Sequence, residues 1–282
     1  MSNEYSSVLF LSLSKFNKLT VQNYNFKYTS MRRSFFILYV ILFLFSCNRH
    51  LVVREVNTEN ISVDSNIGPV DSQLESMIRP YRDSIEHDMS TLVTISSAPL
   101  VKGKPESKLT NLVSDILLES GTVYSLKQNL NIRPDAAYVN YGGLRASLPQ
   151  GEITVERIFE LMPFENEIVL IKISGESFVK MAEKIAARGG EGVAGMMLGI
   201  RNGKISSLTS GGKAIDPTAL YWLVTNDYIA NGGDQMDMFA DAAERINTGL
   251  KIRDVLIQTL NDRYKKDGII EVKEDGRIFN EQ

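Results

Sequence analysis

The stretch NYGGLRASLPQGEIT, residues 140–154, places two glycines and an arginine directly after a strand-like run, AAYVN, residues 136–140. Gly142 and Gly143 lack a Cβ, so the backbone there can adopt conformations and close approaches that other residues resist. Arg145 offers paired donors in a fixed fork, which suit an anion or a ring oxygen. The stretch therefore indicates either a ligand pocket or only a turn that carries a basic residue.

The segments on both sides of this stretch predict the fold class. Helical spacing of apolar residues and caps predicts helices over 74–89, 107–121, 175–188 and 251–264, with a further helix start at Thr154. Runs rich in β-branched residues predict strands at 92–96, 136–140, 167–174 and 221–226. Hairpins are predicted at Asn202–Gly203 and Asp275–Gly276, and glycine-rich loops at 187–195 and 211–217. Helices and strands mix without strict alternation, which indicates an α+β fold, a single domain with a mixed β-sheet and packed helices.

The segment MRRSFFILYVILFLFSC, residues 31–47, predicts export followed by lipid attachment. Two arginines precede an apolar run that is too short for a comfortable membrane span. Residues 44–47 then resemble the lipobox of bacterial lipoproteins, although Phe45 stands where a small residue is usual. Cys47 is the single cysteine of the chain and falls where acylation needs it. An uncleaved signal anchor, or a signal peptide cut elsewhere, is the alternative interpretation.

The lipobox also sets the expected domain boundaries. Met31 is the better initiator, so residues 1–46 read as an over-called start plus a lipoprotein signal peptide. Residues 47–70 would be the acylated cysteine and a polar tether, and residues 71–282 the folded domain. We expect a location in the cell envelope, anchored by lipid to the membrane and facing the periplasm.

Composition and missing motifs exclude several classes of function. The net charge is −3 and no basic run is present, which argues against nucleic acid as a partner. The two histidines, His50 and His87, belong to no metal-binding pattern, and we expect both to face solvent. The sequence contains no nucleophile elbow and no Walker A loop. We therefore predict no metal site and no catalytic residue in this chain.

A second glycine motif, TNDYIANGGD at residues 225–234, also follows a predicted strand. Asp234 can accept two hydroxyl hydrogen bonds, which is what a ribose diol presents. Phe164 follows a proline on a loop between the two motifs, and a flat base could stack between it and Tyr228. Each feature alone is more often a turn, a core residue or a surface ion pair, and the combination in this order is what indicates a pocket.

These residues together resemble the C-terminal domain of the 5′-nucleotidase and UDP-sugar hydrolase family, from about Ser107 to Phe239. The family pattern runs N-x-G-G-I-R, G-x-I-T, P-F-x-N and T-N-D-F-x-A-x-G-G-D. The resemblance implies that Phe164 and Tyr228 sandwich a base, and that Arg145 and Asp234 hold the ribose or phosphate side. The implied substrate-binding residues are Asn140, Gly142, Gly143, Arg145, Phe164, Tyr228, Asn231, Gly232, Gly233 and Asp234.

The sequence departs from the family in two places. Pro105 stands where the family has an arginine, and Lys102 or Lys104 is positioned to compensate. The metallophosphatase domain that carries two metals in the family has no counterpart in this chain. The resemblance therefore implies nucleotide recognition in nucleotide catabolism, without catalysis by this chain and with divalent metal ions in a separate catalytic partner.

Four functions are compatible with these observations. The first is the recognition half of a split hydrolase that binds a nucleotide, a nucleoside or a nucleotide-sugar. The second is a membrane-tethered nucleotide-binding lipoprotein with no catalytic role. The third is a structural lipoprotein that kept the fold and lost the pocket, and the fourth is a metal-free hydrolase that uses Arg145 and Asp234. We rank them in this order, with the first leading the second by little.

Overall fold

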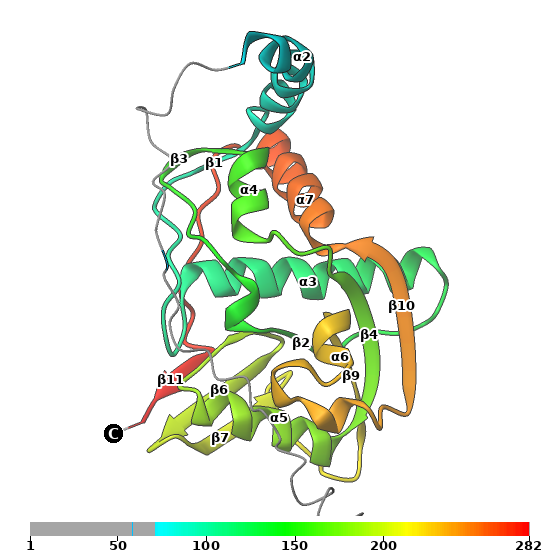
Figure 1. Ribbon diagram of the computed structural model, residues 1–282. Coiled ribbons are helices and arrows are strands. Elements are labelled where there is room, and N and C mark those ends of the chain that lie inside the picture. Colours follow the sequence, from blue (N-terminus) through cyan, green and yellow to red (C-terminus); the bar gives the residue numbers. More distant parts are fainter. Residues whose placement is uncertain (1–57, 59–70, 282) are drawn as a thin grey trace, which may run out of the picture. The chain divides into compact units, whose positions relative to one another are not determined.

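A five-stranded sheet carries the loops singled out above, and its strand order is β10–β4–β9–β2–β5 (Figure 1). Strand β2 is parallel to β9, whereas β4 is antiparallel to both β9 and β10, and β5 is antiparallel to β2. The strands span, in chain order, Ala136–Val139 (β2), Glu167–Ser174 (β4), Gly192–Ala194 (β5), Leu220–Asn226 (β9) and Glu244–Lys251 (β10). The predicted α+β class with a mixed sheet is confirmed.

The computed structural model describes residue 58 and residues 71–281. The predicted signal peptide, the acylated Cys47 and almost all of the tether lie outside the described residues. Among the described helices, none combines the length and the apolar character that crossing a membrane requires.

The helices span Ser72–Met89 (α2), Lys108–Lys127 (α3), Val155–Leu161 (α4), Gly175–Ala187 (α5), Asp227–Ala230 (α6) and Ile252–Asp267 (α7). Helices α3, α4 and α7 cover one face of the five-stranded sheet and α5 covers the other. Strand β4 shows why both faces are buried: Ile168 and Leu170 point into a core formed with α3, α4 and α7. Val169 and Ile171 point to the opposite face, where they pack with α5. Side chains alternate along a strand, so a strand covered on both faces needs an unbroken apolar run.

A four-stranded sheet of order β11–β6–β7–β8 lies beside α5, and a two-stranded pair, β1–β3, forms a separate sheet (Figure 1). The strands span Leu92–Ser96 (β1), Gly151–Thr154 (β3), Met196–Arg201 (β6), Lys204–Ser210 (β7), Lys213–Ala214 (β8) and Ile278–Asn280 (β11). Asn202 and Gly203 join β6 to β7 with φ of 53° and 72°, the two positive values of a type I′ hairpin.

Four local predictions are wrong in whole or in part. Gly121 does not end its helix, since α3 continues to Lys127. The glycine instead allows α3 to pack closely on β9, because a Cβ at this position would lie 2.6 Å from a methyl group of Val224. The stretch 187–195 is not wholly a loop, since β5 pairs with β2 at the sheet edge, and in 211–217 β8 pairs with β7. Asp275–Gly276 makes no hairpin, because β11 adds parallel to β6 instead.

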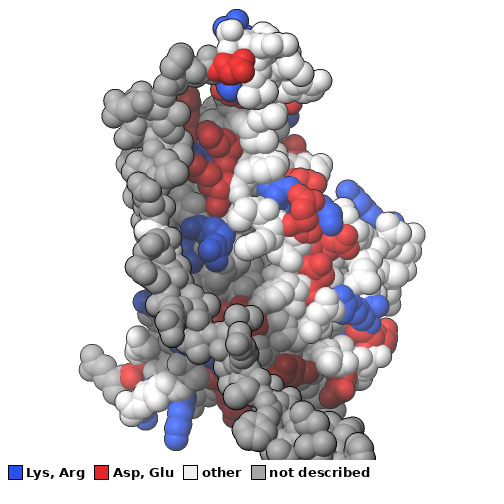
Figure 2. Space-filling view, viewed as in Figure 1, with Lys and Arg blue, Asp and Glu red and all other residues white. Residues whose placement is uncertain are grey.

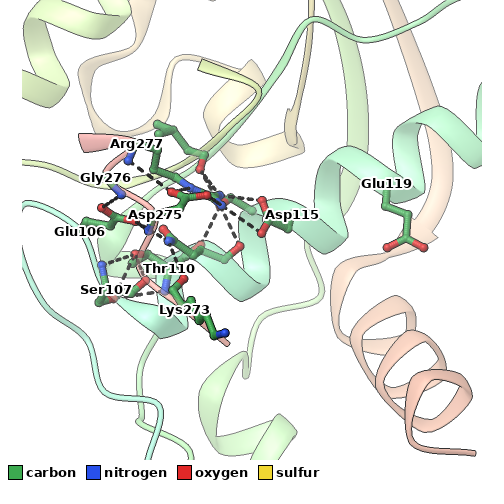
Figure 3. Close-up of polar contacts among 12 residues, drawn as sticks. Glu106, Ser107, Thr110, Asp115, Glu119, Lys273, Asp275, Gly276 and Arg277 are labelled. Atoms are coloured by element: carbon green, nitrogen blue, oxygen red, sulfur yellow. Dashed lines mark hydrogen bonds and ion pairs between the residues drawn. The ribbon is translucent and has the colours of Figure 1, made fainter. Parts of the chain in front are cut away.

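The chain around residues 273–277 is held against the start of α3 (Figure 3). The Glu106 carboxylate accepts hydrogen bonds from the backbone amides of Asp275, at 2.8 Å, and Gly276, at 2.9 Å. The same carboxylate accepts from the side chain of Asn111, at 2.5 Å. Arg277 donates to Asp115 at 2.6 Å and to Asp275 at 2.7 Å. Glu106 and Asn111 therefore have a structural role, because they tie two distant segments together.

Helix α2 differs from the other helices in how little of it is buried. Asp71 caps its start by accepting hydrogen bonds from the amides of Gln73 and Leu74. Pro80 lies inside the helix, which continues past it to Met89. In the described part of the chain none of its residues is buried, and a row of large apolar side chains is exposed: Leu74, Met77, Ile78, Tyr81 and Ile85.

Candidate functional site

Strand topology brings the two glycine motifs and the Phe164 loop to one edge of the five-stranded sheet. Strands β2 and β9 run parallel, so their carboxyl ends, Asn140 and Asn226, meet there. Strand β4 is antiparallel to β9, and its start pairs with the end of β9 through Ile168 and Asn226. Phe164 precedes β4 and Tyr228 follows β9, so the pairing places both aromatics at the same edge.

These loops enclose a cavity of about 360 Å³. Its volume lies at the lower end of the range for small-molecule sites in proteins. The lining residues are Asn140, Gly142, Gly143, Arg145, Phe164, Asn166, Tyr228 and Asp234. The structure thus brings together every residue predicted for the site except Asn231, Gly232 and Gly233.

The three remaining residues of the second glycine motif support the site from outside the cavity. Asn231 accepts a hydrogen bond from Arg245 at 2.6 Å. Gly232 has a φ of +88°, which only glycine adopts without strain, and it turns the chain toward Asp234. A Cβ on Gly233 would lie 2.6 Å from Cζ of Tyr228, so this glycine makes room for the aromatic ring.

The two aromatic side chains are half exposed, Phe164 by 50% and Tyr228 by 47%, although both are large. A single carboxylate ties their loops together, because Oδ1 of Asp227 accepts from Asn166 Nδ2 at 2.9 Å and from the Tyr228 amide at 2.9 Å. It also accepts from the Glu167 amide at 3.2 Å. Asn166 was not predicted as a site residue, although it fills the last position of the P-F-x-N pattern.

Arg253 on α7 holds the Phe164 loop from behind. Its guanidinium is buried and donates to the carbonyl oxygens of Met162, at 3.4 Å, and Pro163, at 3.3 Å. It forms an ion pair with Glu165 and lies 3.9 Å from the ring centre of Phe159. Arg253 was not predicted as a site residue, because its one signal in the sequence is its place beside the inward apolar stripe of α7.

Asp234 presents an oriented carboxylate to the cavity. Its Oδ2 accepts from Asn140 Nδ2 at 2.7 Å, and its Oδ1 accepts from the Tyr228 hydroxyl at 2.9 Å. Asn140 is itself fixed by a hydrogen bond from Asn226 at 3.2 Å. A carboxylate offers about four lone-pair positions, so each oxygen can still accept from a ligand hydroxyl.

Three cations gather beside the cavity on its Arg145 side. Lys102 Nζ donates to the Leu144 carbonyl at 2.6 Å and lies 3.9 Å from the ring centre of Tyr141, and Lys104 Nζ lies 5.0 Å from the same ring centre. Burial, followed by the charges of Arg145 and Lys104, lowers the pKa of Lys102. Within residues 71–281 none of the three forms an ion pair with a carboxylate. The cluster therefore attracts anions.

The face of the molecule shown in Figure 2 carries charges of both signs. On the face shown in Figure 2, acidic and basic side chains alternate over the described residues and form no continuous basic stripe. His87 is exposed on α2, as expected, while His50 lies outside the described residues. In the described part of the chain, no three His, Cys, Asp or Glu side chains gather as metal ligands.

Much of the chain is similar in sequence to known proteins. A family model described as 5′-nucleotidase, C-terminal domain, matches residues 93–241. A 5′-nucleotidase of Vibrio cholerae is 24% identical over 209 residues, which is 72% of this chain and 36% of the relative. Protein UshA of Escherichia coli is 25% identical over 127 residues, 43% of this chain and 23% of the relative. The chain thus spans about a third or less of these relatives.

The fold is also that of a solved structure, the 5′-nucleotidase precursor from Thermus thermophilus. The two superpose with a TM-score of 0.62 at 24% sequence identity, over 73% of this chain and 42% of that chain. The family model covers 149 of the 282 residues, which is more than half. The chain therefore belongs to the family of 5′-nucleotidase C-terminal domains.

Proposed function

We propose that this chain is the nucleotide-recognition component of a 5′-nucleotidase-type hydrolase whose metal-bearing catalytic half is a separate chain. The observation that carries the proposal is the cavity itself, which is lined by two half-exposed aromatic side chains, an oriented carboxylate and Arg145. Lys102 and Lys104 lie beside it, close to Tyr141. Aromatic rings suit a base, a carboxylate suits the hydroxyls of a ribose and cations suit a phosphate, and these are the three parts of a nucleotide.

The base and ribose side is supported by Phe164, Tyr228 and Asp234. Exposed rings on opposite loops offer flat faces to a base, and stacking of this kind contributes about 1–3 kcal/mol per base. Asp234 keeps acceptor positions free on both oxygens, as the hydroxyls of a ribose need. Asn140 holds the carboxylate and also lines the cavity.

The phosphate side is supported by Lys102, Lys104 and Arg145. Pro105 occupies the position at which the family carries an arginine. Lys102 and Lys104, which lie just before Pro105 in the sequence, supply the cations instead. Burial lowers the pKa of Lys102, and the nearby charges of Arg145 and Lys104 lower it further. In the part of the chain that the structure describes, none of these three cations forms an ion pair with a carboxylate. A bound phosphate would balance that charge, so a phosphorylated nucleoside is the better ligand.

Catalysis by a separate chain and membrane attachment complete the proposal. The curated relatives extend well beyond the part that this chain matches, and several are named 5′-nucleotidases. Divalent metal ions would be held by the partner, and this chain would orient the substrate against them. An acylated Cys47 would anchor the complex to a membrane of the cell envelope, facing the periplasm.

Calorimetric titration of the full-length chain with adenosine, AMP and a UDP-sugar tests recognition. We expect Phe164→Ala to weaken adenosine and AMP alike by roughly 5- to 150-fold, the equivalent of one lost stacking contact. The double variant Lys102→Met, Lys104→Met should weaken AMP and leave adenosine unchanged. Arg201→Gln, which removes a surface ion pair between the end of β6 and Glu281, is the matched control. Absence of saturable binding by the wild type would overturn the proposal.

AMP hydrolysis by membranes of the native organism tests the split enzyme. We expect activity to fall when this gene is deleted, to return with the wild-type gene, and to stay low with Phe164→Ala. Unchanged hydrolysis after deletion, in a protein that binds AMP, would favour the tethered binder without a catalytic role. Metal-dependent phosphate release by the purified chain that Arg145→Ala abolishes would show instead that the chain is itself a hydrolase.

A further inference from the structure

We infer that the ion pair between the partly exposed Arg188 and the buried Glu191, neither of which lines the cavity, positions Asp234 and the 140–143 turn for the ligand. The inference rests on the proposed function, because it concerns how the same cavity is held in its binding geometry. Both residues come from the glycine-rich stretch 187–195, to which neither the sequence pattern nor the cavity lining assigns a role.

Glu191 is a buried carboxylate, 5% exposed, with three hydrogen-bond donors around it. The Tyr138 hydroxyl donates at 2.5 Å, the Arg188 guanidinium at 3.1 Å and the backbone amide of Tyr141 at 3.3 Å. A buried charge is tolerated only when it is paired and hydrogen-bonded, so this carboxylate fixes its neighbours as much as they stabilise it. Through the Tyr141 amide it fixes the first residue of the turn that carries Gly142 and Gly143.

Arg188 extends the network to the other side of the cavity. One guanidinium nitrogen pairs with Glu191, and the other donates to the backbone carbonyl of Asp234. The backbone carbonyl of Arg188 accepts from Lys104, one of the three cations beside the cavity. A single residue thus contacts the segments that carry the ribose-side acceptor and the phosphate-side lysine.

Asp234 needs such support because its backbone is strained. Its φ and ψ are 50° and 37°, and the next residue, Gln235, has a φ of 61°. Residues other than glycine seldom adopt the left-handed conformation, so two in succession persist only when contacts hold them. The guanidinium holds the Asp234 carbonyl, while the Tyr228 hydroxyl accepts from its amide at 3.2 Å. These contacts set the direction in which the Asp234 carboxylate enters the cavity.

Gly190 fixes the turn from which Arg188 and Glu191 project. It has a φ of +112°, and a Cβ at this position would collide with the backbone of Pro105. The close approach packs the turn on the segment that carries Lys104, so neither residue of the pair can shift without moving its neighbours. Arg188 and Glu191 are therefore positioning residues that act through Asp234, Tyr141 and Lys104.

A pair of substitutions separates positioning from stability. Arg188→Gln leaves the Glu191 carboxylate buried without its cation, so this variant should melt at a lower temperature and bind adenosine about tenfold more weakly. In the double variant Arg188→Gln, Glu191→Gln, no buried charge remains, and we expect the melting temperature to recover. Adenosine affinity should stay low, because the shorter glutamine cannot reach the Asp234 carbonyl. If affinity recovers together with the melting temperature, the pair is merely structural and the inference is wrong.

A second measurement on the ligand-free full-length chain is independent of binding. Amide hydrogen exchange of residues 231–236 should quicken in the double variant and stay unchanged in the control Arg201→Gln. Unchanged exchange in the double variant would overturn the inference. Absence of adenosine binding by the wild type would instead count against the proposed function, and the exchange experiment would still decide whether the pair holds this segment.

Discussion

Two adjacent glycines of the 140–145 turn have different steric surroundings. A Cβ on Gly143 would lie 2.9 Å from Oδ1 of Asn140, whereas a Cβ on Gly142 has its nearest neighbour, Nδ2 of Asn140, at 3.8 Å. We expect Gly143→Ala to lower the free energy of unfolding by about 1–3 kcal/mol, because Asn140 must move. Gly142→Ala should change it by less than about 0.5 kcal/mol. Urea denaturation of both variants checks this, and equal losses would contradict it.

Tyr138 gives the stability of the protein a specific pH dependence. Burial and the adjacent Glu191 carboxylate raise the pKa of its hydroxyl well above the ordinary value. The unfolded chain releases this proton near pH 10 while the folded chain keeps it, so the stabilising contribution is present below pH 10 and is lost as the pH rises further. Tyr138→Phe should be less stable at pH 8, and the difference from the wild type should shrink between pH 10 and 11. Urea denaturation at several pH values measures it, and a constant difference would refute this assignment.

At the scale of elements, α2 has the least tertiary support. Within the described residues it buries no side chain, and Pro80 removes one of its helical hydrogen bonds. An 18-residue helix without packing is marginal in water, so its amides should exchange much faster than those of α3, which has a buried face. Hydrogen-exchange mass spectrometry of the full-length chain tests this. Protection equal to that of α3 would show that another segment or molecule covers the apolar row.

Predictions that depend on neighbouring residues succeeded, whereas those that depend on contacts between residues distant in sequence failed. Strand β1 and the Asn202–Gly203 hairpin follow from local composition and turn geometry, and both were predicted. Gly121 was expected to end a helix, as glycine often does. The prediction failed because the packing partner of Gly121, Val224, is distant in sequence. The Asp275–Gly276 hairpin failed for the same reason, because the partner of that turn is Glu106.

The candidate site divides in the same way. Residues of the cavity wall belong to motifs that can be read in order, so Asn140, Phe164 and Tyr228 were predicted and line the cavity. Arg253 and Arg188 do not line the cavity, and they hold its loops by donating hydrogen bonds to backbone carbonyls of other segments. No spacing in one sequence reveals such contacts, since a backbone acceptor can belong to any residue type.

At the scale of the whole molecule, Arg277 joins the C-terminal segment to the core of the domain. Its side chain is 12% exposed, bonds to Asp115 and Asp275, and donates to the Val193 carbonyl at 2.9 Å. We expect Arg277→Gln to lower the free energy of unfolding by about 1–3 kcal/mol, because two acceptors lose their charged partner. Arg201→Gln removes an exposed pair with Glu281 and should cost less than about 0.5 kcal/mol. Similar losses in the two variants would show that Arg277 carries no special role.

The hydrogen bonds between the Glu106 carboxylate and the backbone amides of Asp275 and Gly276 also affect the order in which the protein folds during synthesis. Asp275 leaves the ribosome 169 residues after Glu106, which at ordinary rates of translation is a delay of roughly 8 to 34 seconds. During that interval the segment carrying Lys102 and Lys104 lacks the partners of Glu106 at positions 275 and 276. Arg253, which holds the Phe164 loop, is also made before Asp275. A nascent chain can thus complete the aromatic side of the cavity before the segment with Lys102 and Lys104 is held in place.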